Sequence, residues 1–346
     1  MVSPSKLPPP AAPQSSSSVA TSSSAPTSSS RRSKVPKSEE FKSELERQGV
    51  TILDDRFELC EYINGGRHGV VYKGIDNLSG HSVAIKIALP KDQQTAFEVK
   101  VLSRLGLSKF TPDLLYTGLG QRPHPFIVLS EEGQHLKALQ KPFLDLGVGL
   151  DLPRTLLVVH EVVQGLQYLH AKGIVHRDLH PKNLLVGKTK GKSQILICDF
   201  GLSGIRQPDG SFVCQRDTSL LQRVFSTPYH VCKGSPHTEV DDLYSVVYLT
   251  LMLRASKLAD VPTKKLQEMK KSLIYDMLET LPEEDEIFAD FFATVFAQDR
   301  TALPNHSDVL STIKAIDGFN ENLDVRLPEP LPSPLTIEGL AARTRQ

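Results

Sequence analysis

The stretch HRDLHPKN, residues 176–183, is the most informative part of this chain. It brings a carboxylate, Asp178, a histidine, His180, and a carboxamide, Asn183, close together in the sequence. A carboxylate can accept or orient the proton of an attacking hydroxyl group, and a carboxamide oxygen can bind a hard metal ion. The stretch therefore predicts a loop with a general base at Asp178 and a metal ligand at Asn183.

A second acidic residue, Asp199, follows the apolar run Ile195–Cys198. A strand over this run would deliver the carboxylate of Asp199 to the same metal ion as Asn183. The β-rich segment VAIK ends at Lys86, and Glu98 follows on the polar side of a predicted helix. An ion pair between them would hold the ammonium group against bound phosphates. Alternatively, the lysine lies in solvent and the glutamate makes only local helix pairs.

A glycine-rich segment, INGGRHGVVY over residues 63–72, precedes VAIK. Glycines let backbone N–H groups approach phosphate oxygens closely. Alone, such a segment is more often an ordinary β-turn. Asn64 stands where the first glycine of the G-x-G-x-x-G spacing is expected, and Asn tolerates positive φ better than most residues. The residues that we expect around the phosphates are Ile63, Asn64, Gly65, Gly66, Gly69 and Val71.

The composition is electrically balanced, with 40 Lys plus Arg against 40 Asp plus Glu in 346 residues. We therefore expect no nucleic-acid partner and no membrane partner. The four cysteines form no C-x-x-C pair and follow no recognisable signal peptide, which predicts a reducing intracellular compartment, cytoplasmic or nuclear. The longest apolar run, around Leu243–Leu253, is too short to span a bilayer.

The pattern along the chain predicts three parts. Residues 1–50 begin with a Ser-, Pro-, Ala- and Thr-rich segment and are expected to be disordered. Residues 57–130 alternate short β-rich runs with turns and include a helix around 94–106, whereas residues 131–316 are mostly helical. The predicted fold class is therefore α+β, with a small antiparallel β lobe and a larger, mainly helical lobe. The Pro-rich residues 317–346 are expected to form an extended tail.

In this order and spacing, the glycine-rich segment, VAIK, HRDLHPKN and DFG resemble the motifs of eukaryotic-type protein kinases. The resemblance covers Phe57–Ile316. It implies a bilobal kinase fold with ATP and Mg²⁺ in the cleft between the lobes. The implied activity is transfer of the ATP γ-phosphate to Ser or Thr hydroxyls of a protein substrate.

Carried onto this sequence residue by residue, the resemblance also implies individual roles. The catalytic group would comprise Asp178 as base, Lys86 as the ATP-binding lysine with Glu98 as its partner, and Asn183 and Asp199 as Mg²⁺ ligands. The adenine pocket would be lined by Ala84 and Leu129, with a hinge at Ser130–Gly133 that includes Glu131. The resemblance implies that Asp242 supports the catalytic loop. Candidate phosphorylation sites are Thr218, Ser219, Ser226 and Thr227.

His180 departs from this pattern, because Ser/Thr kinases carry a lysine there that contacts the γ-phosphate. A histidine is shorter and only partly charged near neutral pH. Kinase-like enzymes that phosphorylate aminoglycosides or choline also have a histidine at this place, so a small-molecule phosphotransferase is one alternative. Arg177 and the DFG motif favour a protein kinase. A pseudokinase scaffold is the non-enzyme alternative, but it predicts loss of the lysine or aspartates, which are all present.

The chain also departs from the family at a buried ion pair. The glutamate expected after the activation loop is replaced by Lys233 or Gly234, and the arginine expected near the last helices is replaced by Leu303. Losing both charges together is physically consistent, because one buried charge without its partner is costly. We expect this change to affect substrate docking rather than catalysis.

Overall fold

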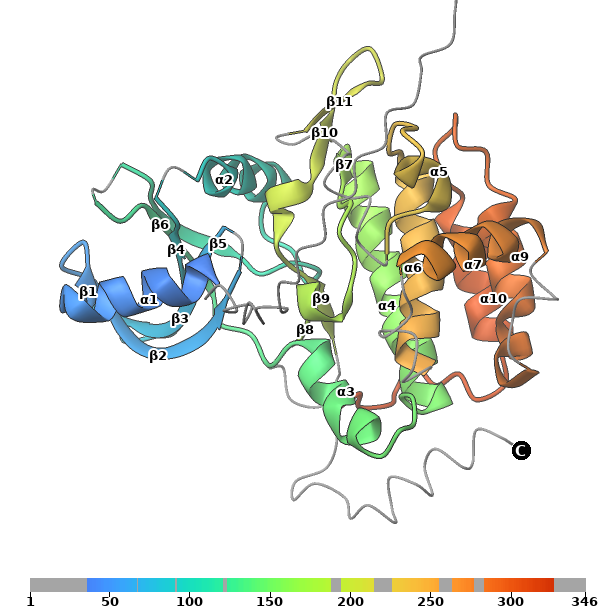
Figure 1. Cartoon of the computed structure of the whole chain (residues 1–346), viewed down its shortest axis with the longest axis horizontal. Coiled ribbons are helices and arrows are strands. Elements are labelled where there is room, and N and C mark those ends of the chain that lie inside the picture. Colours follow the sequence, from blue (N-terminus) through green and yellow to red (C-terminus); the bar gives the residue numbers. More distant parts are fainter. Residues whose placement is uncertain are drawn as a thin grey trace, which may run out of the picture. The chain divides into compact units, whose positions relative to one another are not determined.

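We describe the fold from a computed structural model, shown in Figure 1. The structure describes residues 36–66, 68–90, 92–120, 123–187, 194–214, 226–254, 263–276 and 283–326. Within these residues the chain forms a sheet-rich lobe followed by a mainly helical lobe, which confirms the predicted α+β class. Among the described helices, none is long and apolar enough to cross a bilayer.

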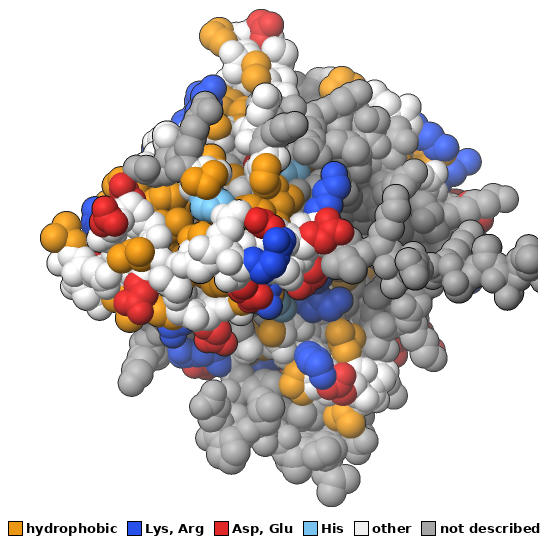
Figure 2. Space-filling model, turned by 60° about the vertical axis from the view of Figure 1, so that its left-hand side comes forward, with side chains coloured by type: hydrophobic (Ala, Val, Ile, Leu, Met, Phe, Trp, Pro, Cys, Tyr) orange, Lys and Arg blue, Asp and Glu red, His pale blue; other side chains and the backbone are white. Residues whose placement is uncertain are grey.

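The first lobe is a six-stranded antiparallel sheet in the order β1-β2-β3-β4-β6-β5. The strands are β1 (Ile52–Leu53), β2 (Phe57–Gly65), β3 (Gly69–Asp76), β4 (Ser82–Ala88), β5 (Leu114–Gly118) and β6 (Phe126–Ser130). The predicted helix is present as α2 (Gln94–Leu105). Figure 2 shows basic and acidic side chains interspersed on the face that it presents, as the balanced composition leads one to expect.

The two faces of this sheet have different partners because side chains alternate along a strand. Val70, Ile85 and Val128 belong to a buried apolar cluster on one face. Residues adjacent to them in sequence point to the other face, where Ala84 of β4 lies opposite Leu129 of β6. The sheet therefore buries one face in its own core and presents the other to a possible ligand.

A helix that the sequence analysis did not predict covers the apolar face. Helix α1 (Lys37–Arg47) packs against β3, and its Phe41 and Leu45 are buried in the same cluster. The two side chains are four residues apart and so lie on one face of the helix. The prediction of disorder up to residue 50 is therefore wrong for this segment, whereas residues 1–35 lie outside the described part.

The second lobe is built around α6 (Glu239–Arg254), which is buried along almost its whole length. Its other helices are α3 (Leu136–Asp145), α4 (Leu152–Ala171), α5 (Tyr229–Cys232), α7 (Thr263–Tyr275), α9 (Ala289–Phe296) and α10 (His306–Ala315). The segment between α4 and α5 contains short strands: β7 (Ile174–Val175), β8 (Leu184–Val186), β9 (Ile195–Ile197), β10 (Gly204–Arg206) and β11 (Phe212–Cys214). Helices α4, α6 and α10 pack together into its core.

The chain continues to pack on this lobe beyond the predicted domain end at Ile316. Val325 is fully buried, and its carbonyl oxygen accepts a hydrogen bond from Arg154 Nε of α4 at 3.2 Å. The first part of the predicted tail is thus folded onto the helical lobe, while residues 327–346 lie outside the described part.

Candidate active site

A buried lysine joins the two lobes through two carboxylates. Lys86 Nζ on β4 donates to Glu98 Oε2 of α2 at 2.6 Å and to Asp199 Oδ1 at 3.1 Å. Glu98 is 2% exposed, so the pairing is not merely a local helix contact. Burial opposes the charge on Lys86, but the two carboxylates raise the pKa of its ammonium above the ordinary value. The geometry brings together the three residues that the sequence analysis placed on separate elements.

Asp199 is held ionised by the same arrangement. Burial raises the pKa of its carboxyl, but Lys86 outweighs that effect and lowers the pKa to about 2. The side chain stays 41% exposed, so it is accessible to a cation. Its backbone has a positive φ of 61°, which is uncommon for a residue with a Cβ and fixes the carboxylate in this position.

The loop over residues 176–183 holds the second acidic group. Asn183 Nδ2 donates to the backbone oxygen of Asp178 at 2.9 Å and to its Oδ2 at 3.2 Å. Both of these bonds use the nitrogen of the amide, so the oxygen of Asn183 is the atom suited to a metal ion. Strand β8 after Asn183 pairs with β9 before Asp199, and Cys198 N donates to the Asn183 carbonyl at 2.9 Å. The two proposed metal ligands are therefore adjacent, and their oxygen atoms suit a hard cation such as Mg²⁺.

His180 lies near the same carboxylate. Its Nδ1 accepts a hydrogen bond from the backbone N–H of Lys182 at 3.2 Å, and its Nε2 lies 3.6 Å from Asp178 Oδ2. Because Nδ1 is an acceptor, the ring proton lies on Nε2 and points toward Asp178. The histidine thus lies beside Asp178, at the position where the family pattern has a lysine.

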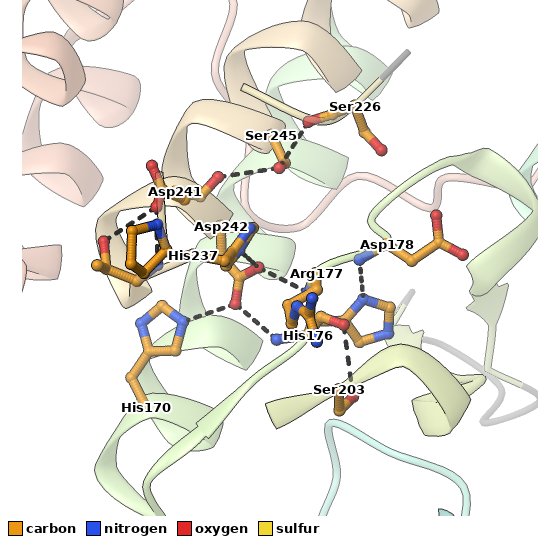
Figure 3. A network of polar contacts seen from close by, with 12 residues as sticks. His170, His176, Arg177, Asp178, Ser203, Ser226, His237, Asp241, Asp242 and Ser245 are labelled. Atoms are coloured by element: carbon orange, nitrogen blue, oxygen red, sulfur yellow. Dashed lines mark hydrogen bonds and ion pairs between the residues drawn. The ribbon is translucent and has the colours of Figure 1, made fainter. Parts of the chain in front are cut away.

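Asp242 lies beside this loop and anchors it, as Figure 3 shows. Its carboxylate accepts from the backbone N–H groups of His176 at 2.7 Å and Arg177 at 2.9 Å. Two histidines, His170 at 3.1 Å and His237 at 3.0 Å, bind the same carboxylate. Burial opposes ionisation of Asp242, but these histidines hold the pKa of its carboxyl far below the usual range. The ionised Asp242 carboxylate therefore holds in place the loop backbone that carries Asp178.

The glycine-rich segment forms the expected turn, but helix packing as well as the turn itself explains its glycines. Gly66 N–H donates to the Gly69 carbonyl at 2.9 Å, which closes the turn. A Cβ on Gly65 would lie 2.8 Å from Ser38 Cβ of α1, so helix packing requires this glycine. Asn64 is not among the described residues with positive φ, and its side chain instead accepts from the Gly65 N–H at 2.8 Å. The turn therefore forms without the positive φ that asparagine would have tolerated at this position.

The residues expected around adenine lie on one face of the sheet. Val71 pairs with Lys86 and Ala84 pairs with Leu129 across adjacent strands, which places all four on the ligand-facing side. At the hinge, Glu131 pairs with Lys73 at 3.4 Å. Ile63, by contrast, is 50% exposed.

The sequence model of the protein kinase domain matches residues 57–311. The chain belongs to the protein kinase family. The match includes the elements that carry all the site residues described above, whereas α1 lies before it.

Several named protein kinases are similar to this kinase. A probable serine/threonine-protein kinase of Dictyostelium discoideum is 26% identical over 273 residues, covering 74% of this chain and 52% of the relative. Serine/threonine-protein kinase PknD of Chlamydia caviae is 26% identical over 261 residues, covering 66% and 27%. Mitogen-activated protein kinase 12 of Danio rerio is 28% identical over 220 residues, covering 60% and 55%. The chain thus spans about half or less of the length of the curated relatives it matches.

The kinase retains an ion pair near the activation segment, but at other positions than the family pattern predicts. Leu303 is 63% exposed, as befits a residue without the expected pairing role. Arg300, three residues earlier, donates to the fully buried Asp241 at 2.8 and 3.0 Å and to the Pro236 carbonyl at 2.8 Å. His230 of α5 also contacts Asp241. The sequence analysis missed this cluster, although the paired acids DD at 241–242 were a visible signal.

Two of the four expected phosphorylation sites, Ser226 and Thr227, lie among the described residues. Ser226 and Thr227 are both 1% exposed, and Thr227 O accepts from the buried Lys270 Nζ at 2.6 Å. Burial hides both hydroxyls from a second enzyme in this conformation. Thr218 and Ser219 lie outside the described residues.

A further residue that the sequence analysis missed is His68 in the glycine-rich turn. It is 9% exposed, and its Nδ1 lies 3.2 Å from Asp92 Oδ1. Asp92 Oδ2 in turn accepts from the Thr95 N–H at 3.0 Å near the start of α2. The glycine-rich turn is thereby linked to the helix that carries Glu98.

Proposed function

We propose that the chain is an ATP-dependent protein kinase that transfers the γ-phosphate of ATP to Ser or Thr hydroxyls of proteins. The observation that carries this proposal is the Lys86 contact with both Glu98 and Asp199, at 2.6 and 3.1 Å. This arrangement requires α2 and the segment after β9 to be in place together, which phosphoryl transfer in kinases needs. When bound, Mg·ATP supplies the electrophilic γ-phosphoryl group and a metal ion that neutralises developing charge.

In this proposal the chain's own side chains divide the work. Asp199 and Asn183 bind Mg²⁺ through carboxylate and amide oxygens. Lys86 binds the α- and β-phosphates, and Glu98 keeps its ammonium group in position. Ala84 and Leu129 contact the adenine, while the backbone of the hinge at Ser130–Gly133 binds its polar edge.

Asp178 accepts or orients the proton of the substrate hydroxyl group. Asn183 fixes its carboxylate through the bond at 3.2 Å, and Asp242 fixes the loop backbone. His180 donates its Nε2 proton toward Asp178 and the transferred phosphate. We propose that Asp178 and His180 act side by side at the reacting hydroxyl and the transferred phosphate, since His180 Nε2 lies 3.6 Å from Asp178 Oδ2.

The proposal extends to the boundaries and setting of the domain. We infer that the kinase domain covers 57–316, with 57–130 and 131–316 as its lobes, and that α1 is integrated into the first lobe. The four cysteines are free thiols, which supports a reducing intracellular compartment for the protein.

The test is a phosphate-transfer assay with labelled ATP, Mg²⁺ and a library of Ser- and Thr-containing peptides. The variant Asp178→Asn should lose about 10²–10⁴-fold in kcat while keeping its affinity for ATP. His180→Lys should retain or raise peptide phosphorylation, because a lysine supplies a full charge at the phosphate. A wild-type protein that binds Mg·ATP but labels neither itself nor any peptide would support a scaffold. Faster ATP consumption with soluble alcohols or amines would support a small-molecule phosphotransferase.

A further inference from the structure

A cavity whose lining contains none of the residues proposed to bind ATP lies between the end of α2 and the second lobe. Its volume is 690 Å³, and it is bounded by the end of α2, the turn from α4 into β7, the end of β10 and the loop before α10. Figure 1 shows α2, β7 and β10 on the same side of the molecule. The residues that line it are Arg104, His170, Ala171, Lys172, Gly173, Arg206, Gln207, Pro208 and Leu303.

The lining of this cavity is strongly basic in a chain with no net charge. Arg104, Lys172 and Arg206 contribute three cationic side chains, and none of the described lining residues is acidic. Arg206 contacts Glu239, which lies outside the lining and offsets one charge. Arg104 Nε is engaged with the backbone oxygen of Lys172 at 2.6 Å, an uncharged partner. The cavity therefore concentrates positive charge that the described structure neutralises only in part.

The two arginines converge on a single glycine. Gly173 has a φ of 70°, and a Cβ at this position would lie 3.1 Å from Arg104 Nη2 and 3.3 Å from Arg206 Cβ. The backbone N–H of Arg206 donates to the Gly173 carbonyl at 2.8 Å, which fixes β10 beside this turn. Because Gly173 has no side chain, the Arg104 guanidinium and the Arg206 side chain can both approach the same small volume. The Arg104 guanidinium therefore lies at this turn together with the side chain of Arg206, whose own guanidinium is paired with Glu239.

We propose that this cavity binds a phosphate monoester dianion. Guanidinium groups present paired N–H donors that match two oxygens of a phosphate, and Lys172 adds a third cation. A volume of 690 Å³ exceeds what one phosphate ion fills and leaves room for the group that carries it. Arg177 beside the catalytic base is not among the lining residues, so this site is distinct from the catalytic loop.

Occupation of the cavity would connect elements that also meet at the active site. Arg104 belongs to α2, which carries Glu98, and Arg206 belongs to β10, which follows Asp199. His170 in the cavity wall binds Asp242, the anchor of the catalytic loop, at 3.1 Å. A bound dianion would hold α2 against β10 and so favour the arrangement in which Lys86 contacts both carboxylates.

The experiment measures thermal unfolding of the full chain with O-phospho-L-serine, against L-serine at equal ionic strength. Wild type should gain about 2–4 °C in Tm at a saturating concentration of the monoester. The double variant Arg104→Gln/Lys172→Gln should lose this gain. The matched control Lys100→Gln/Lys109→Gln, which removes two exposed cations outside the cavity, should keep it. Lys86→Met should also keep it, because the proposed site does not include the nucleotide lysine.

A second arm separates a free metabolite from a phosphorylated side chain. Fluorescence anisotropy of a labelled phosphoserine peptide is compared with competition by free O-phospho-L-serine. Affinity for the peptide more than about tenfold above the free amino acid assigns the site to a phosphoprotein. Equal affinity assigns it to a small phosphorylated molecule. If wild type shows no gain in Tm, or if the Arg104→Gln/Lys172→Gln variant keeps the gain while Lys86→Met loses it, the proposal is overturned.

Discussion

Helix α1 offers the sharpest test of how the first lobe is held together. Phe41 is 7% exposed and packs in the apolar cluster on the face of the sheet opposite the lysine of the ATP site. Ser38 of the same helix touches the glycine-rich segment, since a Cβ on Gly65 would lie 2.8 Å from Ser38 Cβ. The Tyr62 hydroxyl also donates to Glu39 at 3.2 Å. The variant Phe41→Ala should therefore weaken both the lobe and the position of the glycine-rich turn.

The magnitude follows from burial and from the position of α1 in the chain. Replacing a buried phenylalanine by alanine costs about 3–5 kcal/mol, because apolar contact is lost and a cavity remains. Helix α1 precedes the sheet and can detach from it as a unit, so the loss cannot exceed the free energy of docking the helix. We expect about 3 kcal/mol, at the lower end of that range.

Urea unfolding and nucleotide binding measure the two consequences separately. Phe41→Ala should lower the free energy of unfolding by about 3 kcal/mol. It should also raise the Kd for a fluorescent ATP analogue several-fold, since the glycine-rich turn loses its support. Glu46→Ala is the matched control, because its pair with Lys42 at 3.5 Å is solvent-exposed and is expected to matter by less than about 0.5 kcal/mol. A loss below about 1 kcal/mol in Phe41→Ala would show that α1 does not belong to the core of the lobe.

Three further outcomes follow from buried charges. Glu98→Gln leaves Lys86 with one carboxylate and should lower kcat/KM for ATP by about 30-fold or more, measured by steady-state kinetics. Arg300→Gln removes a partner of the buried Asp241 and should lower the free energy of unfolding in urea by about 2–3 kcal/mol. The double variant Arg300→Gln/Asp241→Asn should recover much of this loss. Equal stability of the single and double variants would contradict the prediction. Burial lowers the pKa of Lys270 to about 8 in the folded protein. Between about pH 8 and 10 the unfolded chain therefore binds more protons than the folded chain, and the free energy of unfolding should rise with pH. Lys270→Met should abolish this rise.

The groups that sequence alone could predict are those whose spacing along the chain fixes their place. Lys86 lies within β4, while Asp178, Asn183 and Asp199 lie in short loops beside strands, so local backbone structure determines where each of them lies. Glu98 required one further step, a helix of known phase, and its contact with Lys86 at 2.6 Å confirms that step. For these residues, hydrophobic periodicity and spacing along the sequence were enough to predict their place in the site.

The remaining features depend on contacts between distant segments, which no local pattern encodes. Helix α1 has few apolar residues, and its helical state depends on the sheet that Phe41 covers. The Arg300 pair with Asp241 links residues far apart in sequence, so a shift of three positions from the family pattern was invisible until the fold brought them together. The backbone of Asn64 is likewise determined by strand pairing and a side-chain hydrogen bond with the Gly65 N–H, rather than by turn propensity.

His180 is the place where sequence resemblance and geometry bear on the same question. The sequence left two branches of phosphotransferases open, because both can carry a histidine there. In the structure the Lys182 N–H occupies Nδ1, so the imidazole can act toward Asp178 only as a donor through Nε2. A donor beside the base can stabilise charge on the transferred phosphate without competing for the substrate proton. The histidine can therefore serve the role that a lysine fills in related kinases, and His180→Lys should change the strength of that interaction rather than its direction.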